Sequence, residues 1–405
     1  MRWDTVQLGE VMDVKHGYAF KSESFAESGE YILLSPGNCH GCGGLKLKGD
    51  KEKYYSAEFP PEFLLNEGDM LVVMTDLINT APILGGSFLI PESSRFLHNQ
   101  RLGLVQVTDE KRIDKKFLYY LLNTHSYRGQ VRGSASGATV RHTSPGRIKD
   151  CKVRVPRDVI YQTKIGEVLS AYDDLLENNR QRMELLETAV RLLYQEWFVR
   201  LRFPGHEHTR ITKGIPAGWR ALPLRDICPD LREAANPGDL EADTPYIGLE
   251  HMPRRSITLN EWGRAEEVTS TKLRYRAGDI LFGKIRPYFH KVGFALTDGV
   301  TSSDAIVLRP SSDAFHSLAL LTVSSDWFVT VVSKTAKEGS KMPRADWKLM
   351  EQQAVVVPPG GILAALNETV APILEQLRTL SFANQKLRAA RDLLLPRLMS
   401  GELAV

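Results

Sequence analysis

The 405-residue sequence contains only four cysteines, and none of its apolar runs reaches the roughly 18 residues that a membrane-spanning helix needs. So few cysteines in a chain of this length favour free thiols in a reducing compartment over a disulfide framework. Residues 1–13 also lack the apolar stretch of a signal peptide. We therefore expect a cytoplasmic protein that is neither exported nor inserted in a membrane.

Motifs for catalysis are also missing. The sequence has no phosphate-binding loop of the form GxxxxGK[ST], and no Asp/Asn-Pro-Pro-aromatic loop of the kind that base methyltransferases use. Asp230 has Glu233 three residues on but no adjacent lysine, which is unlike a nuclease site. The pair Cys39 and Cys42 supplies at most half of a zinc site, because structural zinc takes four ligands. We expect no catalytic residue, no metal site and no cofactor bound by this chain.

Charge of one sign does not dominate either. The net charge is +3, with 42% hydrophobic and 25% charged residues, as in an ordinary globular protein. This balance permits a nucleic-acid partner without requiring one, so local clustering of charge has to decide. The length suits two to three domains.

Residues 162–200 contain no proline, and their apolar side chains recur alternately every three and four residues. Asn179 fills the one missing step. This spacing predicts a long helix with a coiled-coil seam. The seam residues are Ile165, Leu169, Tyr172, Leu176, Met183, Leu186, Val190, Leu193 and Trp197.

The same alternation returns near the C-terminus, where Asn384 and Arg391 each occupy one step. Two long seams with one asparagine each are suited to pair with one another. Pro372 and Pro396 interrupt the pattern, so we expect a kink or a fresh start at Pro372 and fraying near Pro396. The apolar seam residues are Leu363, Leu366, Val370, Ile373, Leu377, Leu380, Leu387, Leu394 and Leu398.

An internal repeat with a period near 200 residues indicates a duplicated domain. The opening Trp3…Leu8 recurs as Trp219…Leu224, and later landmarks follow in the same order: Gly68-Asp69 with Gly278-Asp279, and Val155-Pro156 with Val357-Pro358. Each copy has short strand-like runs, a helix, a Gly-rich loop and a strand before its long helix, which predicts an α+β fold. The expected segments are a first domain at 1–156, its helix at 157–205, a linker at 206–218, a second domain at 219–358 and its helix at 359–405.

Basic loops supply the candidate binding residues. Residues 128–149 contain no acid, and the Gly-rich counterpart at 333–348 and the segment 284–291 are also basic. Lysine and arginine neutralise phosphates, and glycine lets the main chain approach closely, so these loops favour DNA binding. Solvated surface loops remain the alternative. The candidate DNA-binding residues are Arg128, Arg132, Thr139, Arg141, Arg147, Lys284, Arg286, Lys341 and Arg344.

Together these features resemble the specificity subunit of type I restriction–modification systems, over essentially the whole chain. The resemblance rests on the unit openings, on the Val-Pro before each long helix, and on the sequences DDLLENN at 173–179 and EWFV at 196–199. The second helix departs from the pattern, with only a weak echo at 374–376.

The resemblance implies two mixed α/β target-recognition domains, each reading one half of a split double-stranded DNA sequence, joined by two helices packed as an antiparallel coiled coil. It also implies a chain without catalysis that binds two modification (methyltransferase) subunits, which use S-adenosylmethionine, and restriction subunits, which use ATP and Mg. The alternatives are an enzyme and a coiled-coil scaffold or oligomerisation protein without DNA specificity.

The two asparagines predict the register of the helix pair. Asn179 falls at a d position and Asn384 at an a position, and antiparallel coils place a layers against d layers. If both share one layer, Leu176 faces Leu387, Met183 faces Leu380, Leu186 faces Leu377 and Val190 faces Ile373. The alternative is that one or both asparagines face solvent at a kink or bind the modification subunit.

Overall fold

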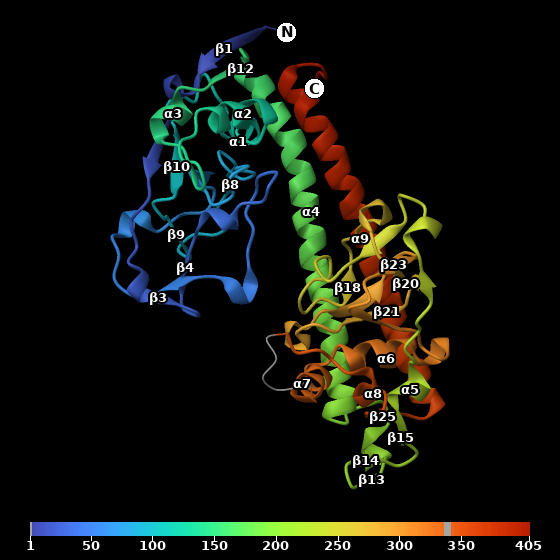
Figure 1. Ribbon diagram of the computed structural model, residues 1–405. Coiled ribbons are helices and arrows are strands. Elements are labelled where there is room, and N and C mark those ends of the chain that lie inside the picture. The colour runs from blue at the N-terminus through green and yellow to red at the C-terminus, as the bar shows by residue number, and fades with distance from the viewer. Residues whose placement is uncertain (1, 336–341) are drawn as a thin grey trace. The chain divides into compact units, whose positions relative to one another are not determined.

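The computed structural model describes residues 2–335 and 342–405, which form two compact units (Figure 1). Unit 1 consists of Met1–Leu176 and Leu387–Val405, and unit 2 of Glu177–Lys386. The sequence assigned the two long helices to segments of their own. In the structure each helix is instead divided between the units, because its apolar side chains belong to the cores of both.

A four-stranded antiparallel sheet in the order β2-β10-β6-β8 forms the centre of unit 1. Its strands are β2 (Met12–His16), β10 (Leu102–Val107), β6 (Met70–Val73) and β8 (Ser87–Leu89). All four residues of β6 are buried, since Met70 and Val72 face one core cluster while Leu71 and Val73 face another. The sheet is therefore covered on both faces.

Three helices of unit 1 have N-cap residues that help to define where they begin. Each begins after a polar residue whose side chain accepts a backbone N–H of the first turn: Asp114, Thr124 and Ser144. The helices are α1 (Lys115–Leu121), α2 (His125–Gly133) and α3 (Pro145–Lys149). The predicted Gly-rich loop at 128–149 is wrong over its first part, because α2 extends to Gly133.

A second, smaller sheet of unit 1 has the order β3-β5-β4-β9. Its strands are β3 (Phe25–Ala26), β5 (Tyr54–Tyr55), β4 (Tyr31–Leu33) and β9 (Phe96–Leu97). The chain closes the unit by pairing β1 (Trp3–Gln7) with β12 (Lys152–Pro156), which leads directly into helix α4 (Val159–Tyr194).

Unit 2 repeats this order of elements. In the sheet β18-β22-β21-β24, strand β21 lies between two antiparallel neighbours, as β6 does in unit 1. Strand β15 pairs with β25 just before helix α9, as β1 pairs with β12 before α4. The bounds are β18 (Thr258–Leu259), β22 (Val292–Ala295), β21 (Ile280–Gly283), β24 (Ala305–Leu308), α6 (His316–Val323), α7 (Asp326–Thr335), α8 (Trp347–Met350), β15 (Arg220–Pro223), β25 (Ala354–Val357) and α9 (Gly360–Ser400).

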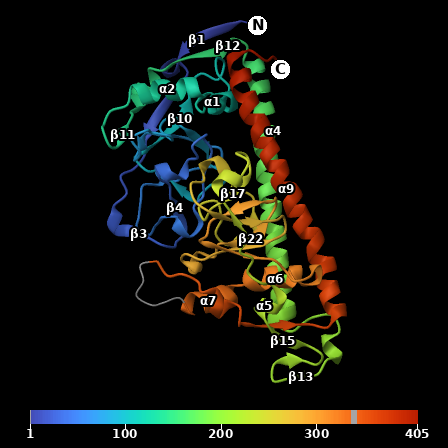
Figure 2. The ribbon, with the colours of Figure 1, turned by 45° about the vertical axis from the view of Figure 1, so that its right-hand side comes forward.

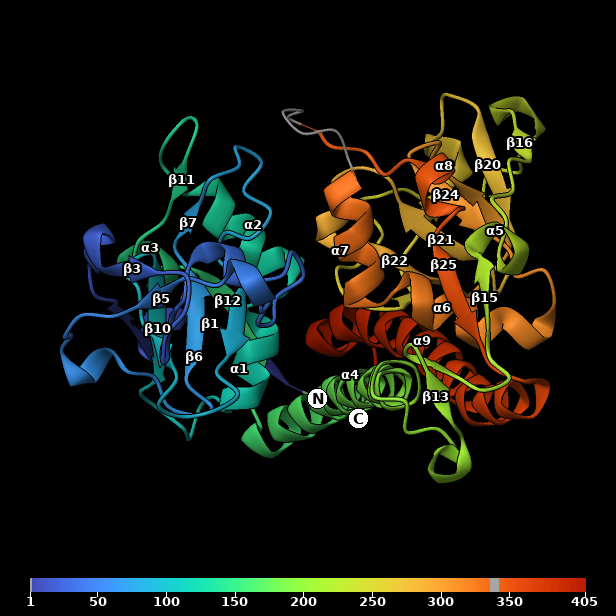
Figure 3. The same cartoon turned by 90° about the horizontal axis from the view of Figure 1, so that it is seen from below.

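A five-stranded sheet in the order β16-β20-β23-β17-β19 completes unit 2. Its strands are β16 (Ala234–Ala235), β20 (Lys272–Tyr275), β23 (Gly299–Thr301), β17 (Pro245–Ile247) and β19 (Gly263–Arg264). Figure 3 shows α4 and α9 next to one another below the strands of this unit.

Helices α4 and α9 run antiparallel within each unit (Figures 1 and 2). In unit 2 the Nδ2 atom of Asn179 donates a hydrogen bond to Oδ1 of Asn384 at 2.9 Å. In unit 1 the Arg391 guanidinium lies 2.5 Å from the Asp173 carboxylate, so the charged step of the second seam has an ionic partner. The predicted meeting of the two asparagines is confirmed.

Proline does not break α9. The helix is continuous from Gly360 to Ser400, so the expected fresh start at Pro372 and fraying near Pro396 are wrong. Both prolines lie on the exposed face of the helix. The carbonyl groups that lose their N–H partner there can be hydrated, which lowers the free-energy cost of each proline.

The segment predicted as a linker, 206–218, contains a short hairpin. Strands β13 (Ile211–Thr212) and β14 (Ile215–Pro216) pair antiparallel, and both turn residues, Lys213 and Gly214, have positive φ. That combination is typical of a tight two-residue hairpin turn.

No single helix among the described residues is long and apolar enough to cross a membrane. The bent pair Asp313–Val323 and Asp326–Thr335 meets the criteria of length and composition only when its two parts are taken together.

Candidate nucleic-acid interface

Arg141 organises the basic loop of unit 1. It lies in β11 (Arg141–His142), which pairs with β7 (Thr75–Asp76), and β7 follows β6 after the single residue Met74. Its guanidinium donates to the carbonyl oxygens of Gly137 at 3.2 Å and Arg132 at 3.1 Å. Gly137 has φ +92°, and a Cβ there would lie 2.0 Å from the carbonyl oxygen of Val140. Only glycine fits this close approach, so the loop has one defined shape.

Arg128 is not a loop residue. It lies in α2 with 5% of its surface exposed, and its guanidinium donates to the carbonyl oxygens of Gly41, at 2.5 Å, and Pro82. Burial lowers the pKa of this guanidinium. The expectation that Arg128 reaches DNA from the Gly-rich loop is therefore wrong, because Arg128 is buried in α2 and its hydrogen bonds hold together three segments of unit 1.

The other candidates of unit 1 are accessible. Thr139 and Arg147 are exposed, and Arg132 is half-buried in the last turn of α2. Arg147 donates to the Ser136 hydroxyl at 3.0 Å, so its position is tied to the same loop. These three residues lie in the stretch of chain on either side of β11.

Arg344 lies beside the end of the central strand of unit 2, as Arg141 does in unit 1. It is paired with Ile285 in an isolated antiparallel bridge, and Ile285 follows β21 as β7 follows β6. Its side chain is exposed and lies 2.9 Å from the Asp304 carboxylate. Both arginines thus lie on the segment that pairs with the residues after the central strand, but not at the same position. The backbone N–H of Thr143 donates to Met74 and that of Ala345 donates to Lys284, so the pairing aligns Arg344 with His142, one residue beyond Arg141. Lys341 lies outside the described residues.

Lys284 and Arg286 flank the same bridge. The Lys284 ammonium donates to the carbonyl oxygen of Ser303 at 2.9 Å, and burial lowers its pKa. Arg286 lies with its guanidinium carbon 5.7 Å from the centre of the Phe289 ring. With Arg344 they form a basic edge at the end of β21.

Arg254 belongs to this edge although sequence reasoning missed it. Its guanidinium carbon lies 3.7 Å from the centre of the Phe289 ring, a cation–π contact closer than that of Arg286. The only hint in the sequence was the basic pair formed by Arg254 and Arg255, which is separated from 284–291 by 28 residues.

Comparison with known proteins finds relatives in one family. The family model described as "Type I restriction modification DNA specificity domain" matches residues 1–188. The MjaIX specificity subunit of Methanocaldococcus jannaschii is 24% identical over 327 residues, 75% of this chain and 72% of that protein. The EcoDI specificity subunit of Escherichia coli is 24% identical over 306 residues, 68% of this chain and 65% of that protein.

A solved structure shares the fold. The specificity subunit from M. genitalium superposes with a TM-score of 0.59 over 98% of this chain and 96% of that chain, at 16% identity. The N-terminal part of the chain thus matches the family model of type I specificity subunits, and most of the chain is similar to curated members of that family. No catalytic family is indicated by these matches.

The acidic residues that could suggest a nuclease do not form a metal site. Asp230 is buried, and burial raises the pKa of its carboxyl group. Within residues 2–335 and 342–405, no three His, Cys, Asp or Glu side chains are grouped so that they could hold a metal ion.

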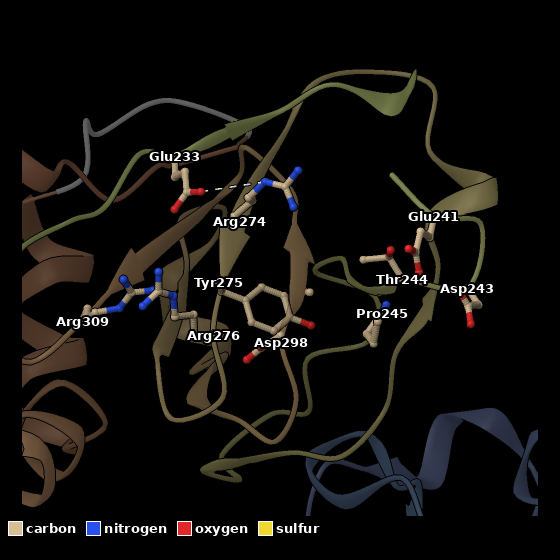
Figure 4. A pocket seen from close by; sticks show the side chains of 11 residues that line it. Glu233, Glu241, Asp243, Thr244, Pro245, Arg274, Tyr275, Arg276, Asp298 and Arg309 are labelled. Atoms are coloured by element: carbon tan, nitrogen blue, oxygen red, sulfur yellow. Dashed lines mark ion pairs between the residues drawn. The ribbon is translucent and has the colours of Figure 1, made fainter. Parts of the chain in front are cut away.

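A cavity of about 440 Å³ opens in unit 2 between β17, β20 and β23 (Figure 4). Its lining carries charges of both signs. Arg274 lies 3.9 Å from Glu233, and Arg309 lies 2.7 Å from the carboxylate of Asp279. Two of its three arginines are already neutralised, so the cavity gives no basis for assigning a ligand.

Proposed function

We propose that this chain acts as a specificity subunit and reads a two-part, asymmetric DNA sequence, with one half-site for each unit. The observation that supports this most strongly is the repeated placement of Arg141 and Arg344 beside equivalent central strands. Around these arginines the two units differ in chemistry. Unit 2 adds Lys284, Arg286 and Arg254, whereas residues 74–80 of unit 1 contain no basic side chain. Different side chains at equivalent places suit different base sequences.

In this proposal residues 1–156 and 219–358 are two duplicated target-recognition domains. Helices α4 and α9 pack as an antiparallel coiled coil, and their length sets the spacing between the half-sites. Half-sites read from one face of DNA lie roughly 34 Å apart for each helical turn. The Asn179–Asn384 hydrogen bond supports a fixed register for the pair.

Catalysis belongs to the partners. Two modification subunits dock on this chain and use S-adenosylmethionine, and restriction subunits use ATP and Mg; the chain itself binds none of these cofactors. The purified chain incubated with DNA and S-adenosylmethionine is expected to leave the DNA unmethylated, and methylation by the chain alone would refute this division of labour.

The decisive experiment exchanges one domain. The chain is assembled with its modification subunits, and methylated sites are mapped by sequencing. Replacing residues 219–357 with the matching domain of a relative should change one half-site and leave the other intact. Changes in both halves would refute the modular reading.

A scaffold without DNA specificity is the alternative. Titration of DNA binding with salt separates the two, because each phosphate contact contributes roughly 0.9 to the slope of log affinity against log salt concentration. A flat response would favour the scaffold.

A further inference from the structure

The turn between β21 and β22 presents an exposed aromatic side chain from a rigid base. Tyr288 has 54% of its surface exposed and lies at the middle of the short helical turn Pro287–Phe289. Its ring packs edge-on against that of Phe289, with the centroids 4.9 Å apart. The ring is thus held in position although most of its surface faces solvent.

Backbone strain is concentrated at this turn. Arg286 and His290, which bracket it, have φ of +51° and +53°, and Arg255 has φ +58°. These are three of the seven non-glycine residues with positive φ in the described part of the chain. The backbone N–H of Arg255 donates to the carbonyl oxygen of His290 at 3.0 Å, so this hydrogen bond connects Arg255 to the turn that Arg286 and His290 bracket.

One buried contact and one exposed ion pair hold the residues with left-handed backbone in place. His290 is 6% exposed, and its Nε2 lies 2.7 Å from the carbonyl oxygen of Ser324. The Arg255 guanidinium lies 3.0 Å from the Asp326 carboxylate at the start of α7. Left-handed backbone at a non-glycine residue has a free-energy cost of order 1–3 kcal/mol and persists where the surroundings enforce it, commonly at functional sites.

Unit 1 has an equivalent turn after β7, where the exposed side chains are aliphatic. Leu77 is 65% and Ile78 57% exposed. Asp76 is buried, and its carboxylate accepts the backbone N–H of Ile78 at 3.0 Å and that of Ile83 at 2.8 Å. This turn also contains a strained residue, Ala81, with φ +49°.

Both turns lie beside the arginine that was assigned to DNA. Asp76, next to Leu77, is the direct partner of Arg141 in the β7–β11 pair, and Ile285, next to Arg286, is the partner of Arg344. Single exposed apolar side chains are common on protein surfaces. Here the exposed apolar side chains lie on turns with left-handed backbone that are held by hydrogen bonds, and they lie next to basic residues in both units. This arrangement is less common than a single exposed apolar side chain.

We propose that Tyr288 in unit 2, and Leu77 with Ile78 in unit 1, contact the bases of the two half-sites through apolar surface. The inference rests on the proposed function and adds the residues that read sequence. Hydrocarbon and aromatic groups cannot neutralise a phosphate, but they pack against the thymine methyl group or against the face of an opened base step. Arg254, which lies against Phe289 next to Tyr288, then holds the DNA backbone in place in unit 2.

The test uses the complex of the chain with its modification subunits. Affinities for a specific and a non-specific duplex are measured at several salt concentrations. Tyr288→Ala should lower specific affinity by roughly tenfold, with non-specific affinity and the salt slope unchanged, and should relax sequencing-mapped methylation at one half-site. Tyr288→Phe, which keeps the ring, should retain the affinity. Leu77→Ser with Ile78→Ser should relax the other half-site.

Exposed apolar residues elsewhere provide the controls. Ile211→Ser in unit 2 and Leu47→Ser in unit 1 remove side chains that are 50% and 52% exposed. Neither change should alter the affinity for the specific duplex or the mapped methylation. Arg254→Ala should weaken both duplexes equally and reduce the salt slope by roughly one.

Three outcomes would overturn the inference. They are unchanged specificity in Tyr288→Ala, an equal loss in Tyr288→Phe and Tyr288→Ala, or a smaller salt slope with uniform weakening. Failure of the unaltered complex to discriminate between the duplexes would instead refute the proposed function itself. Thermal melting of each variant, expected to match the unaltered chain, separates loss of contact from loss of folding.

Discussion

The side-chain amides of Asn179 and Asn384 are hydrogen-bonded to one another across α4 and α9, with 2.9 Å between Nδ2 of the first and Oδ1 of the second. Asn384 is 7% exposed, and the next layer of the seam contains Met183, Leu380 and Ser381, all buried. A polar pair between apolar layers has one favourable alignment. Moving either helix by a heptad would place each amide against hydrocarbon.

Replacing only one of the two asparagines should therefore destabilise unit 2. Asn384→Leu leaves the Asn179 amide facing an apolar side chain and should lower the free energy of unfolding by about 1–3 kcal/mol. The double change Asn179→Leu with Asn384→Leu should recover most of this loss, as measured by urea unfolding. Equal losses in the single and double variants would argue against coupling.

Cross-linking tests the register directly. A variant with cysteines at 179 and 384, in a Cys42→Ser background, should form an intramolecular disulfide efficiently on oxidation. Cysteines at 186 and 384, one heptad away, are the control. Preferential cross-linking of the control pair would contradict the register.

Glu187 on α4 should be a large contributor to the stability of unit 2. Its buried carboxylate accepts hydrogen bonds from the hydroxyls of Ser256 and Thr258, both at 2.7 Å, and from the backbone N–H of Ile257 at 3.2 Å. Glu187→Ala would leave these donors without their acceptor, and we expect a loss of about 3 kcal/mol in the free energy of unfolding.

The matched control is Glu184→Ala, one turn earlier. Glu184 is exposed and pairs only with Arg180, so its removal should change the free energy of unfolding by about 0.5 kcal/mol or less. A loss as large as that of Glu187→Ala would show that helix charge, rather than the buried acceptor, carries the effect.

Arg141→Ala and Arg344→Ala should each weaken DNA binding at one half-site only. A bidentate arginine contact to a base discriminates by about 1–3 kcal/mol, and lysine does not replace the planar fork. Binding and mapped methylation should therefore also suffer in Arg141→Lys. Arg157→Ala removes the same charge elsewhere in unit 1 and serves as the control. Unchanged binding and methylation after either alanine change would refute that assignment.

Sequence reasoning succeeded where the pattern is local. The seam of α4 and α9 has a fixed period along the chain, so the meeting of Asn179 and Asn384 could be predicted from spacing alone. The order of landmarks in the repeat placed the loop at 333–348 as the counterpart of the loop at 128–149, and Arg344 and Arg141 do lie beside the central strands of the two units. The short strand-like runs expected in each copy are present as strands, because short β-type runs identify them.

It failed where distant segments decide the environment of a side chain. Arg128 is buried because Gly41 and Pro82, 87 and 46 residues away, supply its acceptors. Arg254 is brought to Phe289 by the fold of unit 2. The left-handed backbone of Arg286 and His290 has no signal in composition, because neither residue is a glycine.

Cysteine reactivity gives a test of the structure that needs no DNA. Cys42 is the one exposed cysteine among the four, all of which the structure describes. Burial raises the pKa of Cys39 to about 12 and that of Cys151 to about 11, and it also raises the pKa of Cys228. The thiolate is the reactive form, so at pH 8 a thiol with a pKa near 12 is ionised in roughly one molecule in ten thousand.

A short treatment with iodoacetamide at pH 8 should therefore add one group, at Cys42, as read by peptide mass spectrometry. Cys42→Ser should abolish this fast reaction, and urea should expose all remaining thiols. Fast labelling of Cys39 in the folded chain would contradict its burial between the 39–44 turn and Arg128.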